Sequence, residues 1–530
     1  MTEKVTTRSL FCGGDINGFL GLLGDNLACL SFLAGILIGV YHFPPDVIFL
    51  YMFPGTCFAV FLGDMVFTIV GVRLAKRIGH TKIAAMPLGL DTPSTIGLAL
   101  IVIGPAFAAM KEGGMSVHQA ALGAWYVGMA GIVIIGACKI IAVPFANKIQ
   151  KIVPRAGLLG SLAGVGIALI GMMPLVSIFS VPIVGVISFG IVLYALIANI
   201  DLPKKIPGVF VAIVVGTVLY HILGPLGWIN IVYTAPPTNF YFGYPLPTLD
   251  FVNGIVPSLQ YLPIIIPFAI LVIVGDINVA ESAVAAGDPY NAKQTLLIDG
   301  CCTLIGGLCG AVAQTTAYVG QPAYKRMGSK MGYTLYAGLF IGFGGVFGYI
   351  SFFVGLIPTS VLAPILVFVA LEVVGQGFIS SPKRHATAVC LAMMPSIARY
   401  LAIQYSTDKL QQLISHTGAE LPAVLVTTAL GSGFILVGML WGAFLAELID
   451  RRLKKAAVYL LITSAFSFFG IVNSADLNGA LYLPWTLKGV EASVAYSFAF
   501  GYLILAVMFF FLSFTHGAKA GRLKNIDYDY

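Results

Sequence analysis

The sequence contains few charged residues. Only 10% of its 530 residues are Asp, Glu, Lys or Arg, whereas a soluble domain carries about 25%. Hydrophobic residues make up 58% of the chain. Apolar runs of roughly 18 residues, long enough to cross a bilayer as a helix, follow one another almost from end to end. The composition therefore excludes a soluble protein and predicts an all-α polytopic membrane protein.

The usual signs of metal, redox or enzymatic chemistry are also missing. The eight cysteines include no CxxC pair, and there is no His-Glu-x-x-His motif and no pair of acids at catalytic spacing. The first apolar run is too long for the h-region of a cleavable signal peptide. We therefore expect no disulfide, no metal site, no cofactor and no enzymatic activity. A receptor that binds a ligand without transporting it stays open as an alternative.

The net charge of +7 arises from clusters of Lys and Arg between the apolar segments, for example at residues 73–82 and 451–455. When the N-terminus is placed in the cytoplasm, every basic cluster falls on the cytoplasmic side, as the positive-inside rule requires. Both termini are then cytoplasmic. The excess charge is explained by topology, so no nucleic-acid partner is expected.

The apolar segments predict sixteen membrane spans. The twelfth span is placed at 358–378, and the thirteenth, at 385–404, has the weakest apolar signal because it contains Arg399. The chain divides into a cytoplasmic N-terminus (1–17), a first repeat of seven spans (18–223), an external loop (224–260), a second repeat of seven spans (261–447), two extra C-terminal spans (448–516) and a cytoplasmic tail (517–530). The loop is rich in Pro, Tyr and Phe, which fits either an ordered cap or a long linker.

Two pairs of segments in the two halves resemble each other. Span 1 contains "GLLGDNLACL" and span 8 contains "LVIVGDINVAES". Span 3 contains "AAMPLGLDTPSTIGLAL" and span 10 contains "AVAQTTAYVGQPAYKRMG", and Pro and Gly interrupt both. Because each pair is seven spans apart, its members have opposite orientations. This pattern predicts an inverted repeat with two broken helices, an arrangement that places a substrate near the middle of the bilayer.

Acidic side chains inside the spans are the strongest functional signal, because each costs about 2.5–3.5 kcal/mol at a helix centre. Asp276 and Glu281 in span 8 are the candidates for proton coupling, and Asp276 is also a substrate ligand. Asp25 and Asp64 are interpreted as structural, and Asp299 also falls inside a span.

Polar residues beside the two breaks complete the candidate substrate site. Amide groups and tyrosine rings suit a flat heterocycle with alternating N–H and C=O groups. The alternative is that these polar side chains only join helices together. The candidate substrate-binding residues are Asp276, Gln321, Tyr318, Leu90, Asp91 and Thr316.

The motifs "GDINGFLGLLGDNL", "AMPLGLDTPS", "AESAVAAGDPYNAKQTLLIDG" and "TTAYVGQPAYKRMGSKMGY" occur in this order. Together they resemble the nucleobase:cation symporter-2 superfamily, and within it the xanthine/uracil permease-like, AGZA-type branch, over residues 13–447. The resemblance implies a seven-plus-seven inverted-repeat transporter fold. A core domain would comprise spans 1–4 and 8–11 and a gate domain spans 5–7 and 12–14, with a short strand in spans 3 and 10. It also implies transport of purines or pyrimidines with H⁺, or sometimes Na⁺, and a homodimer formed through the gate.

By this resemblance the substrate-binding acid of span 8 is Asp276, and the backbone contact of span 3 lies near Leu90 and Asp91. In span 10 many members have a second carboxylate or an Asn, where this chain has Val319, Gly320 and Gln321. We therefore expect a proton symporter for a nucleobase such as xanthine or uracil in a plasma membrane, specifically a bacterial inner membrane. A sulfate- or carboxylate-type anion transporter on the same fold is the alternative.

Overall fold

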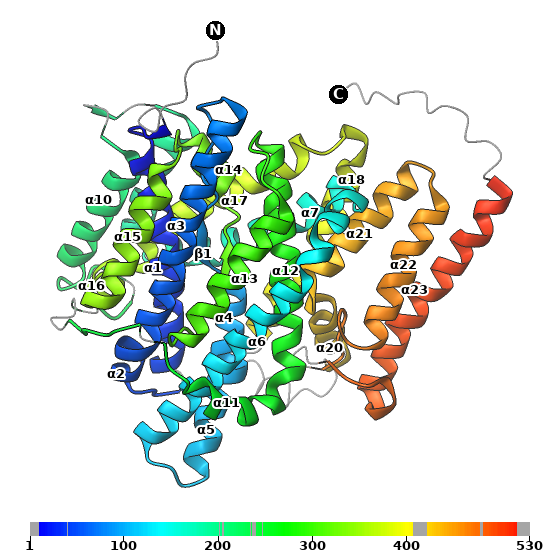
Figure 1. Cartoon of the computed structure of the whole chain (residues 1–530), viewed down its shortest axis with the longest axis horizontal. Helices are drawn as coiled ribbons and strands as arrows, with labels where there is room; N and C mark the ends of the chain where they lie inside the picture. The colour runs from blue at the N-terminus through cyan, green and yellow to red at the C-terminus, as the bar shows by residue number, and fades with distance from the viewer. Residues whose placement is uncertain are drawn as a thin grey trace. The chain divides into compact units, whose positions relative to one another are not determined.

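The computed structural model describes residues 10–39, 41–200, 202–203, 206–229, 231–233, 235, 240–245, 247–405, 421–476 and 481–516. The predicted N-terminal segment up to residue 9 and the tail 517–530 lie outside the described residues. Within the described part, nearly all regular structure is helical, and the exceptions are two three-residue strands. The predicted all-α polytopic membrane fold is confirmed, with broken spans and a small two-stranded sheet (Figure 1).

The chain forms two compact units. Unit 1 comprises residues 1–146 and 170–372, and unit 2 comprises residues 147–169 and 373–530. The boundaries between them fall within continuous helical segments, among them α6 (Val117–Ile152) and α17 (Thr359–Ile379).

Unit 1 contains the two broken spans and most of the remaining helices. Its elements are α1 (Asp15–Gly39), α2 (Pro45–Val47), α3 (Phe53–Ile78), β1 (Leu88–Leu90), α4 (Thr92–Leu98), α5 (Gly104–Glu112), most of α6 (Val117–Ile152), α8 (Met173–Ser180), α9 (Pro182–Val192), α10 (Gly208–Leu223), α11 (Phe251–Ser258), α12 (Leu262–Ala285), α13 (Ala292–Leu308), β2 (Thr315–Ala317), α14 (Gln321–Arg326), α15 (Gly332–Phe347), α16 (Tyr349–Leu356) and most of α17 (Thr359–Ile379). α11 lies within the predicted external loop.

Unit 2 contains the C-terminal helices. Its elements are α7 (Arg155–Val165), α18 (Ala386–Tyr405), α20 (Leu421–Gly431), α21 (Phe434–Ile449), α22 (Leu453–Phe468) and α23 (Gly489–His516). α18 covers the predicted span 385–404. α7, α18 and α21 pack against one another, and α22 and α23, in the predicted extra spans, lie side by side (Figure 1).

Among the described residues, nine helices are long and apolar enough to cross a membrane, and the number rises to eleven if each of two bent helix pairs is one span. One bent pair is α15 and α16, between which the chain bends by 104° at Gly348. Gly348 has φ 77°, a left-handed conformation that glycine adopts without steric cost. Three further apolar helices contain between 10 and 17 residues.

Several long helices in unit 1 contain a π-helical turn, and a proline explains two of these turns. Ile48–Met52 and Ala99–Ile103 are π-helical, and Pro54 and Pro105 follow them by two residues. Proline has no N–H group, and its ring clashes with the carbonyl of residue i−4. The wider π turn accommodates that clash, so the helix continues through the proline.

The two strands pair with each other across the two halves of the sequence. β1 and β2 are antiparallel, and Leu88, Gly89 and Leu90 lie opposite Ala317, Thr316 and Thr315. α4 begins two residues after β1 and α14 begins four residues after β2. A short strand followed by a half-helix was expected in both span 3 and span 10, and both are confirmed.

Candidate functional site

Buried polar side chains complete the hydrogen bonding of the strand pair. A two-stranded sheet leaves the outer backbone groups of each strand unpaired, and such groups are costly inside a membrane. Asp64 Oδ1 on α3 accepts from Leu88 N at 2.9 Å, and Asn26 Oδ1 on α1 accepts from Leu90 N at 3.1 Å. Asp276 Oδ1 on α12 accepts from Ala317 N at 3.0 Å. Helices of both repeats thus hold the strand pair in place.

Asp276 is completely buried and accepts hydrogen bonds from β2. Besides Ala317 N, its Oδ1 atom accepts a hydrogen bond from Thr316 Oγ1 at 2.9 Å. Its second oxygen, Oδ2, has no hydrogen-bond partner among the described residues and lies 3.7 Å from Lys139 Nζ. The structure therefore brings together two residues predicted from the sequence, Asp276 and Thr316, and adds a lysine to them.

Lys139 on α6 is a fully buried cation. Its Nζ atom donates to Asp299 Oδ2, to Thr315 O at 2.8 Å and to Thr303 Oγ1 at 3.4 Å. Asp299 Oδ1 accepts from the hydroxyls of Thr303 and Thr315. We call Lys139, Asp276 and Asp299 the buried charge triad.

Small residues allow α6 and α13 to approach closely enough to form the triad. A Cβ atom at Gly136 would lie 2.7 Å from Leu304 N, and one at Gly300 would lie 3.1 Å from the Cβ of Lys139. Glycine at such positions lets the backbones of two membrane helices come together. The lysine on α6 consequently faces the aspartate on α13.

The triad has an unbalanced charge when all three groups are ionised. One lysine contributes +1 and two aspartates contribute −2, so the net charge is −1 in a region where all three side chains are 0% exposed. An unpaired charge in a low-dielectric interior is strongly disfavoured. The triad therefore contains one acidic group more than its lysine can neutralise.

Asp91 and Leu90 lie at the junction of β1 and α4. Asp91 is the N-cap of α4, and its side chain accepts from Ser94 N at 2.9 Å. Its backbone N–H donates to Gln314 O at 2.7 Å. The Asp91 carboxyl also lies within electrostatic range of Lys139 and Asp299. The predicted site-lining position of Asp91 thus neighbours the triad.

Tyr318 follows β2 and is buried. Its ring stacks on that of Tyr324, with centroids 6.0 Å apart and an angle of 22° between the planes. The Tyr318 hydroxyl lies near the Asp25 carboxyl. A Cβ atom at Gly89 would lie 3.1 Å from the Tyr318 ring, so β1 passes close to this side chain.

Gln321 belongs to a different group. Its Nε2 atom donates to Asp288 Oδ2 at 2.6 Å, and Lys325 Nζ donates to Asp288 Oδ1 at 2.6 Å. Asp288 lies in the loop between α12 and α13, where burial raises the pKa of its carboxyl although Lys325 and Gln321 act in the opposite direction. The Nε2 group of Gln321 is therefore occupied by a loop residue, whereas its buried Oε1 atom has no hydrogen-bond partner among the described residues. The substrate role of Gln321 stays a prediction.

Glu281 follows Asp276 on α12 and is buried, with 6% of its surface exposed. Its role in proton coupling also stays a prediction. Within the described residues, no group of three or more His, Cys, Asp and Glu side chains is suited to a metal ion.

Lys139 is the residue that the sequence analysis missed. It lies in the otherwise apolar segment "GACKIIAVPF" of a predicted span, where a lysine is as costly as an acid. That cost was considered for acids alone. The same criterion applied to both signs of charge identifies Lys139.

No family model matches the sequence, and neither does any curated protein compared with it. The chain is similar in structure to the transmembrane domain of a cyanobacterium bicarbonate transporter, BicA, with 17% identity, 76% of this chain and 97% of that chain covered, and a TM-score of 0.46. It is also similar to SLC26A9, with 14% identity, 72% and 62% of the two chains covered, and a TM-score of 0.45.

Proposed function

We propose that this protein is a secondary active transporter that moves a small polar solute together with a proton. The observation that carries the proposal is the buried charge triad of Lys139, Asp276 and Asp299 beside the paired strands. Secondary transporters place their substrate and coupling-ion sites between broken helices of this kind. A purely structural ion pair does not need a second buried acid.

Protonation of the triad supplies a physical coupling mechanism. The ionised triad has a net charge of −1, and one proton on Asp276 or Asp299 makes it neutral. A second proton makes it +1 because Lys139 keeps its charge. An anion beside Lys139 is repelled by the ionised triad, whose net charge is −1, and attracted by the doubly protonated triad, whose net charge is +1. Proton binding and anion binding therefore reinforce each other. Na⁺ in place of the first proton would act in the same direction.

We favour a small inorganic or carboxylate anion as the substrate. The nucleobase hypothesis requires a carboxylate that is free to accept the N–H groups of a base. Asp276 Oδ1 already accepts from Thr316 and Ala317, and the nearby Lys139 ammonium competes with a base for the remaining Oδ2 atom. An anion needs a cationic centre instead. Lys139 supplies one, and protonation of Asp299 would release the Nζ hydrogen bond that Asp299 Oδ2 now accepts.

A nucleobase is the second candidate, and one group of residues favours it. The stacked rings of Tyr318 and Tyr324 offer an aromatic face next to β1. Gln314 has a buried Oε1 atom without a hydrogen-bond partner among the described residues. These groups suit a flat heterocycle, with Leu90, Asp91 and Gln321 as further proposed contacts.

The remaining features of the proposal follow from the predicted topology. The core and gate domains move against each other and expose the site alternately to the two sides of a plasma membrane. We propose a bacterial inner membrane. Both termini face the cytoplasm, and two copies form a homodimer through their gates. Glu281 serves as a second proton-carrying acid on α12.

The proposal is tested by uptake into proteoliposomes with an imposed pH gradient. Bicarbonate, sulfate, a dicarboxylate, uracil and xanthine are offered separately, with and without Na⁺. We expect one anion to accumulate in response to the gradient, and Asp276→Asn to abolish accumulation while the protein still inserts. Glu112→Gln, at an exposed position, is the control. Full accumulation by Asp276→Asn would refute the proposal. Accumulation of only uracil or xanthine would show that the substrate is a nucleobase and not an anion.

A further inference from the structure

A cavity of about 470 Å³ lies between α3 and the start of α13, away from the buried charge triad. Three basic side chains line it: Arg73 and Arg77 near the end of α3, and Lys293 in the first turn of α13. All three are exposed, and no lining residue is acidic. The cavity therefore concentrates positive charge.

Nothing in the described part of the chain neutralises the two arginines, since neither Arg73 nor Arg77 takes part in an ion pair there. The N–H groups at the start of α13 are already capped, because Asn291 Oδ1 accepts from Lys293 N and Gln294 N. The attraction for an anion consequently comes from side-chain charge. Arginine suits phosphate especially well, because its planar fork donates two parallel hydrogen bonds.

Apolar side chains also line the cavity. Val70, Leu74, Pro289 and Leu297 line it, and Leu297 is 42% exposed. Ile69, adjacent to this wall on α3, is 51% exposed. A ligand that fits has an anionic head and an aliphatic continuation along α3 and α13, which is the chemistry of a phospholipid.

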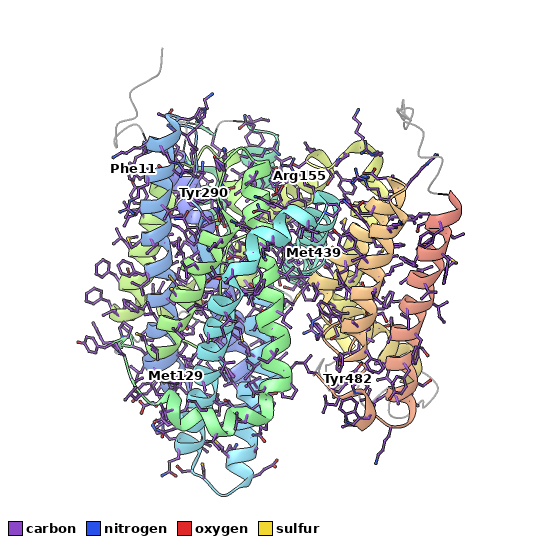
Figure 2. All side chains as sticks on the ribbon, turned by 45° about the vertical axis from the view of Figure 1, so that its right-hand side comes forward. Phe11, Met129, Arg155, Tyr290, Met439 and Tyr482 are labelled. Atoms are coloured by element: carbon purple, nitrogen blue, oxygen red, sulfur yellow. The ribbon has the colours of Figure 1, made fainter. Side chains whose placement is uncertain are left out.

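The position of the cavity agrees with such a ligand. Tyr290 forms part of its wall, and Figure 2 shows Tyr290 near the end of unit 1 that holds Phe11 and far from Met129. Arg73, Lys76 and Arg77 belong to a basic cluster that the sequence predicts at the cytoplasmic boundary. By that prediction the cavity lies at the depth of the lipid headgroups, in the cytoplasmic leaflet that carries anionic lipids.

We propose that this cavity binds the phosphate group of an anionic phospholipid, with Arg73, Arg77 and Lys293 on the phosphate and the acyl chains along Val70, Leu74 and Leu297. The site is separate from the proposed transport site and does not depend on it.

Lipid binding in the cavity would affect the proposed transport site through Tyr290. The Tyr290 hydroxyl donates to Ala84 O at 2.9 Å and accepts from Met86 N at 3.1 Å. These two residues lead directly into β1, which begins at Leu88. A lipid packed against Tyr290 therefore stabilises the segment that positions the strand pair.

The test measures lipid binding and thermal unfolding of the full-length protein in detergent micelles, without any transport. Phosphatidylglycerol, phosphatidylcholine and inorganic phosphate are titrated separately, and unfolding is followed by the fluorescence of the four tryptophans. The triple variant Arg73→Gln/Arg77→Gln/Lys293→Gln is compared with Lys76→Gln/Lys82→Gln/Lys148→Gln, which loses the same charge at exposed positions outside the cavity.

We expect phosphatidylglycerol, and not phosphatidylcholine, to raise the unfolding temperature of the wild-type protein. The cavity variant should bind phosphatidylglycerol about a hundredfold more weakly, since each of the three basic residues contributes to attraction of an anionic headgroup, and the control variant should bind normally. Equal binding by both variants would overturn the site. An equal shift with inorganic phosphate alone would show a phosphate site and overturn the lipid assignment. A transport defect changes neither readout.

Discussion

Replacement of Lys139 by methionine is the most direct test of the buried charge triad. Methionine keeps the length and much of the volume of lysine but removes its charge and its donors. Asp299 then loses its cationic partner and Thr315 O loses a donor at 2.8 Å. Breaking a buried ion pair in this way costs about 3–5 kcal/mol, of which the neutral hydrogen bond is about 1 kcal/mol.

A second substitution separates charge from packing. Lys139→Met leaves two buried carboxylates and a net charge of −2, whereas Lys139→Met/Asp299→Asn returns it to the wild-type value of −1. Asp276 keeps its hydrogen bonds from Thr316 and Ala317 in both variants. The double variant should therefore be less destabilised than the sum of the two single variants, with a coupling free energy of about 1–3 kcal/mol between the two positions.

The assay is equilibrium unfolding in mixed detergent micelles for the wild-type protein, the two single variants and the double variant. If Lys139→Met unfolds at the same denaturant concentration as the wild-type protein, the lysine does not neutralise buried acids. If the losses of the single variants simply add in the double variant, Lys139 and Asp299 do not interact energetically. Either result would refute the triad as an electrostatic unit.

Three further substitutions test other parts of the structure. Asp91→Ala removes the N-cap of α4 and should cost about 1 kcal/mol in unfolding measurements, while Asp91→Asn keeps most of that stability; equal losses would contradict the capping role. Gly55→Ala should destabilise by about 1–3 kcal/mol, because the new Cβ would lie 2.5 Å from a backbone nitrogen, whereas Gly35→Ala, with open space around it, should be neutral. Burial raises the pKa of the Asp450 carboxyl, but hydrogen bonds from Arg384 and a neighbouring histidine outweigh burial and hold the pKa below its ordinary value. A lowered pKa means stability that is present above the unfolded-state pKa and lost as the pH falls through the folded-state value. Asp450→Asn should therefore flatten the loss of stability below about pH 4, and an unchanged acid profile would count against this contribution.

The positions of the broken spans could be predicted from the sequence because their cause is local. Pro87, Gly89 and Pro93 interrupt one apolar run and Gly320 and Pro322 interrupt the other. Proline and glycine disturb a helix wherever they occur in it. The strand pairing follows once both breaks face each other, and the resemblance to a family of transporters made that expectation explicit.

The charge triad could not be predicted in the same way. Lys139 and Asp299 are 160 residues apart in the chain, and their contact depends on how closely α6 and α13 pack at Gly136 and Gly300. The hydrogen bond between Gln321 and Asp288 depends similarly on the path of a loop. The sequence indicates which buried residues need partners, but the partner is determined by tertiary packing.

The pairing of β1 with β2 also has a consequence for biosynthesis. Leu90 and its partner Thr315 are 225 residues apart (315 − 90), so at about 5–20 residues per second the ribosome adds the second strand on the order of tens of seconds after the first. During this interval the backbone groups of β1 have no strand partner. Water or the insertion machinery has to shield them, and the first half of the chain reaches its final structure only after the second half has entered the membrane.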